Sequence, residues 1–163
     1  MNRFARAGTT AVLSLLIPML VHAADVQSIS GTYKLVKRTL PDGKTIVPPD
    51  VVGLMTLSGG FRNFNVSWKG PDGKRVSLSL IAEYALSVRQ FCERVAFWAA
   101  NNLAGSGLSY EVPAATKKCS PVTMTNGKIT FQMPGEPPTA EFAKDGMTAT
   151  ATGQFIDHWK KID

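Results

Sequence analysis

Apolar residues occupy every second position along several stretches of this chain. The longest such stretch is RVSLSLIAEYAL, residues 75–86. Its alternate apolar positions are Val76, Leu78, Leu80, Ala82, Tyr84 and Leu86. The stretches RNFNVSW (62–68) and KITFQM (128–133) alternate in the same way. A period of two is typical of antiparallel strands that bury one face.

Turn signals separate these stretches at short intervals. The tetrapeptide PDGK occurs at 41–44 and again at 71–74, and the pairs Gly-Gly at 59–60, Asn-Gly at 126–127 and Asp-Gly at 145–146 offer further tight turns. Glycine and asparagine adopt positive φ at low cost, as hairpin turns require. The residues around the two PDGK turns do not match, so the repeat indicates two similar turns and no internal duplication.

The pattern predicts an all-β fold of about eight to ten strands, with no long helix after the N-terminal segment. The expected strands are 30–40, 51–58, 61–69, 75–87, 89–98, 107–112, 121–125, 128–133, 139–143 and 147–160. Many short strands at hairpin spacing suggest a sandwich or an antiparallel up-and-down barrel, and closure into a barrel removes exposed edges. A barrel of this size has room inside for side chains or one small ligand.

The stretch YALSVRQFCERVAFW, residues 84–98, fits a helix and a strand about equally well by itself. As a strand it places Phe91, Glu93, Val95 and Phe97 on one face. Its neighbours favour the strand, because the preceding strand ends near Leu86 and the next three residues can form a short turn.

The first 23 residues read as a secretory signal peptide. Arg3 and Arg6 precede an eleven-residue apolar run, residues 11–21, and the sequence VHA ends at Ala23 with small residues at the −3 and −1 positions. The run is too short to span a membrane, which takes roughly 20 residues. Cleavage after Ala23 leaves one domain, 24–163, and no cysteine follows the cut to carry a lipid anchor. The chain is therefore expected to be periplasmic or secreted.

Charge gives little indication of a partner. Without Arg3 and Arg6 the chain has sixteen basic and twelve acidic residues, a net charge of about +4. The basic residues are dispersed, and no block of them is suited to a phosphate backbone. We expect no nucleic-acid partner and no transmembrane segment in the mature chain, and the sequence does not indicate an oligomeric state.

The two cysteines, Cys92 and Cys119, are expected to form a disulfide, because an exported chain meets an oxidising environment. The competing hypothesis is a nucleophilic or metal-binding thiol, but His158 is the single histidine left after cleavage. The common metal, phosphate-loop and hydrolase motifs are missing from the sequence. We therefore predict no metal site, no cofactor and no catalytic residues.

The layout resembles the bacterial lipocalin-like domain family. The resemblance is carried by SGTYKLV from Ser30, the PDGK turn, PPDVVGLMTLS from Pro48 and the closing FIDHWKKI from Phe155. Where that family has tryptophan in its first strand, this chain has Tyr33. The resemblance implies a calycin-type barrel around an apolar cavity, and it implies structural closure roles at the barrel base for Gly31, Tyr33, Trp159 and Lys160.

One charged pair is the main candidate site. In the strand register Arg62 shares a face with Phe64 and Trp68, and Glu93 shares a face with Phe97. If these faces point inward, the two charges lie among aromatics and need pairing or a polar ligand; alternatively, both reach solvent at the rim. The candidate ligand-binding residues are Arg62, Phe64, Trp68, Tyr84, Glu93, Phe97, Phe131 and Phe155.

Three functions remain open at this stage. The first is a non-enzymatic barrel that binds a small hydrophobic or amphipathic molecule. The second is an isomerase or cyclase on the same barrel, with Glu93, Arg62 or Tyr84 as polar groups. The third is a barrel without a pocket that acts through an exposed apolar surface as an envelope adaptor.

Overall fold

The computed structural model describes residues 28–70, 72–103, 105, 107–112 and 116–163. The signal peptide expected at residues 1–23 lies outside this part of the chain. Every regular element in the described ranges is a strand. A search of these ranges for a helix long and apolar enough to cross a membrane finds none.

Thirteen strands make up the described fold. They are β1 (Gly31–Thr39), β2 (Thr45–Ile46), β3 (Val51–Ser58), β4 (Phe61–Lys69), β5 (Arg75–Leu86), β6 (Gln90–Asn101), β7 (Leu108–Glu111), β8 (Lys118–Pro121), β9 (Thr123–Thr125), β10 (Lys128–Gln132), β11 (Thr139–Ala143), β12 (Gly146–Ala151) and β13 (Phe155–Lys161). The expected ranges 51–58, 61–69 and 139–143 coincide with β3, β4 and β11.

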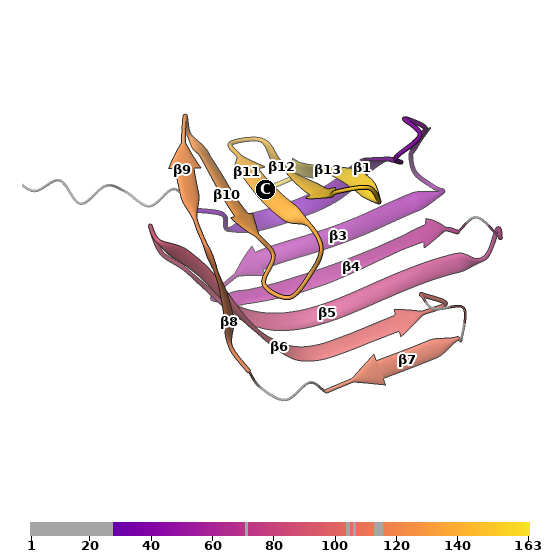
Figure 1. Cartoon of the computed structure of the whole chain (residues 1–163), viewed down its shortest axis with the longest axis horizontal. Coiled ribbons are helices and arrows are strands. Elements are labelled where there is room, and N and C mark those ends of the chain that lie inside the picture. Colours follow the sequence, from indigo (N-terminus) through magenta and orange to yellow (C-terminus); the bar gives the residue numbers. More distant parts are fainter. Residues whose placement is uncertain (1–27, 71, 104, 106, 113–115) are drawn as a thin grey trace, which may run out of the picture.

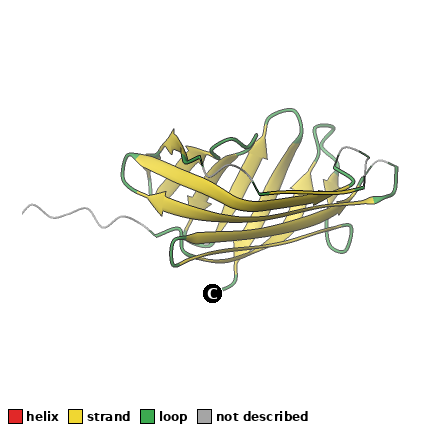
Figure 2. Ribbon diagram, turned by 90° about the horizontal axis from the view of Figure 1, so that it is seen from below, coloured by secondary structure: helices red, strands yellow, loops and turns green. Residues whose placement is uncertain are grey.

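The strands form one antiparallel sheet in the order β7-β6-β5-β4-β3-β1-β13-β12-β11-β10-β9, with β2 beside β1 and β8 beside β6. Strand β1 lies between β3 and β13. The first and last strands of the fold are therefore neighbours in the middle of the sheet. The sheet curls strongly, so that β10 to β12 face β4 to β6 (Figures 1 and 2). The predicted all-β, antiparallel fold is confirmed, in the form of a strongly curled half-barrel.

One extended segment links the two edges of the curled sheet. Its first part, β8, pairs with the beginning of β6, and its second part, β9, pairs with β10. Between them the Val122 amide donates a hydrogen bond of 3.0 Å to the Arg89 carbonyl. Figure 1 shows this segment crossing from β6 to the upper side of the molecule. The strands β7 and β9 at the two ends of the sheet order do not pair with each other. The segment that contains β8 and β9 nevertheless closes the barrel at this end, because it pairs with β6 and with β10.

The disulfide predicted between Cys92 and Cys119 is confirmed, and it lies at this closure. The two cysteines are direct cross-strand partners on β6 and β8, with their Cα atoms 4.0 Å apart. The stretch 84–98 is strand and turn, as its neighbours indicated, because β5 ends at Leu86 and β6 begins at Gln90.

Several of the expected strand ranges are wrong. The range 147–160 is a hairpin of two strands, β12 and β13, because Gly153 adopts a φ of 72° in a turn between them. The range 121–125 omits β8, and β2 was not expected at all, which brings the number of strands from about ten to thirteen. Both omitted strands are too short to produce an alternating pattern.

Two bulges shift the alternation and turn unexpected residues inward. In β1 the register shifts between Leu35 and Lys37, so Val36 is the extra residue and Arg38 points to the buried side. In β6 the shift lies at Ala96, because Ile81 pairs with Phe97 whereas Ala82 pairs with Val95. A bulge inserts one residue and reverses the facing of those that follow.

The second bulge corrects the expected face of Phe97. Cross-strand partners share a face of the sheet, and the partner of Phe97, Ile81, is 44% exposed. Phe97 therefore lies on the outer face, and the next residue, Trp98, pairs with the buried Leu80 and faces inward.

A row of stacked aromatic rings fills the closed end of the barrel. Phe131 stacks on Phe91, with ring centroids 4.2 Å apart, and on Phe142 at 5.6 Å. Tyr84 extends the row beyond Phe91, and Tyr33 meets Phe142 edge to face. The row connects strands that lie across the barrel from each other. Its ring contacts therefore stabilise the curled shape of the sheet as well as filling the interior.

The disulfide should contribute a large share of stability, because it fixes the closing segment. Replacing both cysteines by serine is expected to lower the free energy of unfolding by roughly 3 to 4 kcal/mol on the chain-entropy model, for a separation of 27 residues. Urea denaturation of the oxidised wild type and the double variant measures this. An unchanged midpoint would contradict the role given to the closure, as would two titratable thiols in oxidised protein.

Tyr33 should make stability fall in alkaline solution. Burial raises its pKa to about 12, and the nearby charge of Asp163 adds to the effect. Because the native state holds this proton more tightly than the unfolded chain, the stabilisation is complete below pH 10 and is lost as the pH rises toward 12. The loss should approach about 2 to 3 kcal/mol. Tyr33→Phe should show a flatter pH profile in the same denaturation measurement, and an equally steep profile would exclude Tyr33 as the cause.

Candidate functional site

The curled sheet forms the walls of an open cavity of about 1530 Å³. Its walls are mainly aromatic and aliphatic side chains from both sides of the barrel, among them Phe64, Trp98, Phe131 and Trp159. Charged residues also reach the cavity, and four of these are buried: Arg38, Arg62, Glu93 and Asp157. The cavity is therefore apolar with a few convergent polar groups, as small-molecule sites usually are.

Six of the eight candidate residues line this cavity. They are Arg62, Phe64, Trp68, Glu93, Phe131 and Phe155. Tyr84 lies behind Phe91 in the aromatic row, and Phe97 faces outward. The structure thus brings the expected charged pair together inside the barrel and places four aromatic candidates around the same space.

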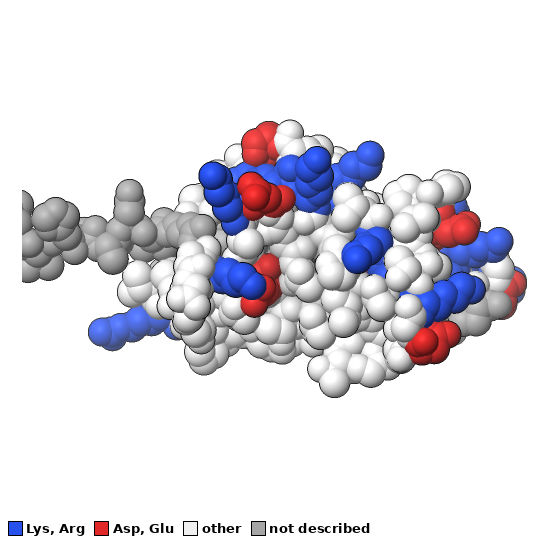
Figure 3. Space-filling view, turned by 90° about the horizontal axis from the view of Figure 1, so that it is seen from above, with Lys and Arg blue, Asp and Glu red and all other residues white. Residues whose placement is uncertain are grey.

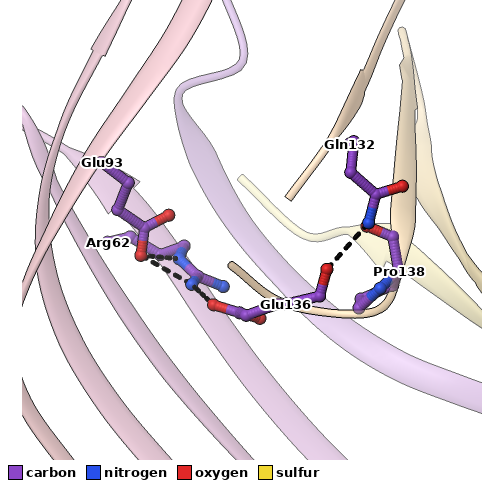
Figure 4. Close-up of polar contacts among 5 residues, drawn as sticks. All are labelled: Arg62, Glu93, Gln132, Glu136 and Pro138. Atoms are coloured by element: carbon purple, nitrogen blue, oxygen red, sulfur yellow. Dashed lines mark hydrogen bonds and ion pairs between the residues drawn. The ribbon is translucent and has the colours of Figure 1, made fainter. Parts of the chain in front are cut away.

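Arg62 binds two carboxylates at once (Figure 4). Its Nη2 and Nε atoms donate hydrogen bonds of 2.7 and 3.2 Å to Oε1 of Glu93, and Nη2 also donates to Oε1 of Glu136. Arg62 and Glu93 are each 3% exposed, whereas the Glu136 side chain is 28% exposed. The guanidinium also lies 5.5 Å from the centre of the Phe64 ring. We call Arg62, Glu93 and Glu136 the Arg62 cluster.

The charge balance of the Arg62 cluster perturbs both buried groups. Burial raises the pKa of Glu93, Arg62 opposes this, and the negative charge of Glu136 raises it further. Burial lowers the pKa of Arg62, but Glu136 and Glu93 outweigh that effect and leave it raised. The second oxygen of Glu93, Oε2, is buried and has no hydrogen-bond partner among the described residues. Glu93 is thus a carboxylate in the wall of a largely apolar cavity, with one buried oxygen that has no hydrogen-bond partner in the described part of the chain.

The loop between β10 and β11 carries Glu136 to this position. The side-chain amide of Gln132 donates hydrogen bonds to the backbone carbonyls of Glu136, Pro137 and Pro138, at 2.8, 2.9 and 3.1 Å. The Thr139 hydroxyl in turn donates to the side-chain oxygen Oε1 of Gln132 at 2.9 Å. Figure 4 shows the Glu136 side chain pointing toward Arg62, with Gln132 on the other side of the loop. These contacts hold the loop in place, so Glu136 reaches Arg62 from the opposite side of the barrel.

A second buried ion pair lies in the same cavity. Arg38 binds Asp157 through two parallel hydrogen bonds, Nε to Oδ1 at 2.6 Å and Nη2 to Oδ2 at 2.7 Å. The guanidinium is flanked by the rings of Trp68 and Phe155, whose centres are 4.7 and 4.2 Å away. Such a two-pronged pair between aromatic faces satisfies the buried charge in a low-dielectric setting. Two aromatic candidates from the sequence thus meet on an arginine that the sequence analysis did not select.

Several cavity residues were missed by the sequence analysis, namely Arg38, Trp98, Glu136, Asp157 and Trp159. The inward position of Asp157 could have been predicted from the sequence, because Asp157 alternates with Phe155 and Trp159 on the buried face of β13. Arg38 and Trp98 follow bulges, so strict alternation assigns them to the outer face. Glu136 lies in a loop, where no periodicity predicts the direction of a side chain.

Trp159, expected to be a structural closure residue, also lines the cavity. Its ring packs where Gly53 has no side chain: a Cβ atom at Gly53 would lie 2.7 Å from the ring. The indole Nε1 is buried, and no described residue accepts a hydrogen bond from it. Trp159 and Glu93, two residues of the cavity wall, therefore hold one buried donor and one buried acceptor without a hydrogen-bond partner among the described residues.

The described residues contain no group of three or more histidine, cysteine or acidic side chains placed to hold a metal ion. On the surface, Lys and Arg side chains alternate with Asp and Glu and do not form one continuous patch on the face seen in Figure 3. The candidate site is therefore the cavity with its two buried ion pairs.

Comparison with known proteins gives one structural likeness. No protein-family model matches the chain, and no curated protein matches it. The fold matches the crystal structure of a lipocalin-like protein from Bacteroides uniformis ATCC 8492, with 11% sequence identity, a TM-score of 0.36, and coverage of 82% of this chain and 97% of that chain. The description of the fold rests on the strand order and register given above.

Breaking the Arg38–Asp157 pair should destabilise the protein strongly. Arg38→Met leaves Asp157 buried without a counter-charge, which should cost roughly 3 to 5 kcal/mol of unfolding free energy. The control is Lys128→Met, which removes the exposed pair with Glu141 and should cost less than about 1 kcal/mol. Replacing Asp157 by leucine in the Arg38→Met background should recover most of the loss. Equal effects for the buried and the exposed pair would contradict this account.

Proposed function

We propose that this chain is an exported protein that binds a small hydrophobic or amphipathic molecule inside its barrel. The observation that carries the proposal is the cavity of about 1530 Å³, walled by aromatic side chains and containing two buried ion pairs. The volume exceeds the roughly 300–1,000 Å³ of pockets for drug-sized ligands, so it leaves room for a larger ligand. Such a cavity speaks against the alternative of a pocketless adaptor.

The disulfide indicates an oxidising compartment outside the cytoplasm. We propose that residues 1–23 direct the chain there and are removed after Ala23, leaving a periplasmic or secreted protein. A ligand supplied from the cell envelope or the surrounding medium suits this location.

One observation supports a second candidate, an isomerase or cyclase acting on an apolar substrate. Glu93 combines a raised pKa with an unpartnered oxygen inside the cavity, as a general base requires. The two candidates differ in what leaves the protein. A ligand recovered chemically unchanged supports binding, whereas conversion to an isomer with altered chromatographic retention, lost in Glu93→Gln, supports catalysis.

Filling the cavity should abolish binding without unfolding the barrel. Ala149 is 9% exposed and lines the cavity on β12, whereas its neighbour Thr148 lies on the opposite face of the same strand. Ala149→Phe should weaken binding of a fluorescent fatty-chain probe by about tenfold or more because it occupies ligand volume. The matched variant Thr148→Phe should bind like the wild type.

Fluorescence titration of the oxidised mature protein measures both variants, after circular dichroism has established that they fold. Equal binding by Ala149→Phe and the wild type would place the probe outside the barrel and refute the proposal. Native mass spectrometry of wild-type protein after incubation with an envelope lipid extract gives an independent test, because a binding protein should retain a defined mass.

A further inference from the structure

We infer that the cavity selects an amphipathic molecule with an ammonium head, which Glu93 binds through its free oxygen. The inference rests on the proposed function and specifies the chemistry of the ligand. It starts from an imbalance in the Arg62 cluster: two carboxylates, Glu93 and Glu136, share one guanidinium.

The group of the Arg62 cluster that lacks a hydrogen-bond partner is an acceptor. Both Arg62 nitrogen atoms that donate to Glu93 use the same oxygen, Oε1. Glu93 Oε2 is left buried without a partner among the described residues. A buried acceptor without a partner loses its hydration and gains nothing in return. A ligand that brings an N–H donor to this oxygen removes that cost.

An anionic head has no comparable place in this cluster. Arg62 is already occupied by Glu93 and Glu136, so a ligand carboxylate would have to displace one of them. Arg38 is bound by Asp157 in a two-pronged pair and is flanked by two rings. Both buried guanidinium groups thus have their counter-charges within the protein.

Two features favour a cation over a neutral hydroxyl. The first is the excess negative charge of the Arg62 cluster. It attracts a buried cationic head strongly, because little water lies between them to screen the charges. The second is the aromatic wall, because Phe64 already lies against a cation at Arg62 and Phe131 lines the same cavity.

Lys118 is a cation outside the Arg62 cluster that also lines the cavity. It lies opposite Glu93 on β8, but it is exposed, it forms no ion pair within the described residues, and its Nζ lies over Gly135. The counter-charge for the second carboxylate is therefore left for a ligand to supply.

Three ligands with the same twelve-carbon chain test this inference: dodecylammonium, dodecanol and dodecanoate, each below its micelle concentration. Titration calorimetry on the full-length mature protein gives the three affinities. The wild type should bind dodecylammonium about tenfold more tightly than dodecanol, since hydrogen bonds between charged groups exceed neutral ones in strength. Dodecanoate should bind most weakly.

Glu93→Gln should remove the preference for dodecylammonium over dodecanol. This variant keeps Arg62 paired with Glu136, so the buried guanidinium retains a partner. The matched control is Glu83→Gln, on the neighbouring strand, whose carboxylate binds Arg94 and is about half exposed. It should retain the wild-type order of affinities.

If Glu93→Gln does not fold, Glu136→Gln supplies the test, because it removes one negative charge and leaves Oε2 of Glu93 in place. It should lower the preference for dodecylammonium by about threefold. A wild-type preference for dodecanoate, or an ammonium preference that survives Glu93→Gln or Glu136→Gln unchanged, would overturn the inference. Equal binding of dodecanol and dodecylammonium would overturn it while leaving the proposed function intact. Failure to bind any of the three chains would overturn both.

Discussion

The cavity exists because one extended segment, residues 118–125, hydrogen-bonds to both edges of the same sheet. A curled sheet without such a link leaves two open edges that unpaired backbone groups would expose. Here β8 satisfies the start of β6, β9 satisfies β10, and the disulfide between Cys92 and Cys119 holds the segment in register. The aromatic row from Tyr84 to Tyr33 then fills the closed end, so the remaining interior volume stays as a cavity.

Closure also sets the electrostatics of the interior. Inside the barrel a charge has little water around it and must be paired within the protein or by a ligand. Arg38 meets this requirement completely, with one carboxylate and two aromatic faces. Arg62 is over-supplied, because Glu93 reaches it from the sheet and Glu136 from a loop on the opposite side. Arg38 and Asp157 thus form a structural ion pair, whereas the Arg62 cluster has one more carboxylate than it has cations.

The alternating pattern predicted strands β3, β4 and β5 and the common face of Arg62, Phe64 and Trp68, because these strands are regular along their whole length; it left open whether that face points inward. It failed after the bulges. Strict alternation places Arg38 and Trp98 outside and Phe97 inside, and the structure reverses all three. A bulge depends on how two paired strands twist together. Its position therefore cannot be predicted from the alternation within one strand alone.

The sequence by itself determined the antiparallel strands, most of their buried faces and the pairing of the only two cysteines, since these follow from local alternation, turn residues and the oxidising compartment expected for the chain. Only the tertiary structure decided that Glu93 points into a cavity, that Arg62 neutralises it and that Glu136 joins them. The physical reason is distance along the chain: the three residues come from β4, β6 and a loop between β10 and β11. They meet only because the sheet curls far enough to bring its opposite sides together.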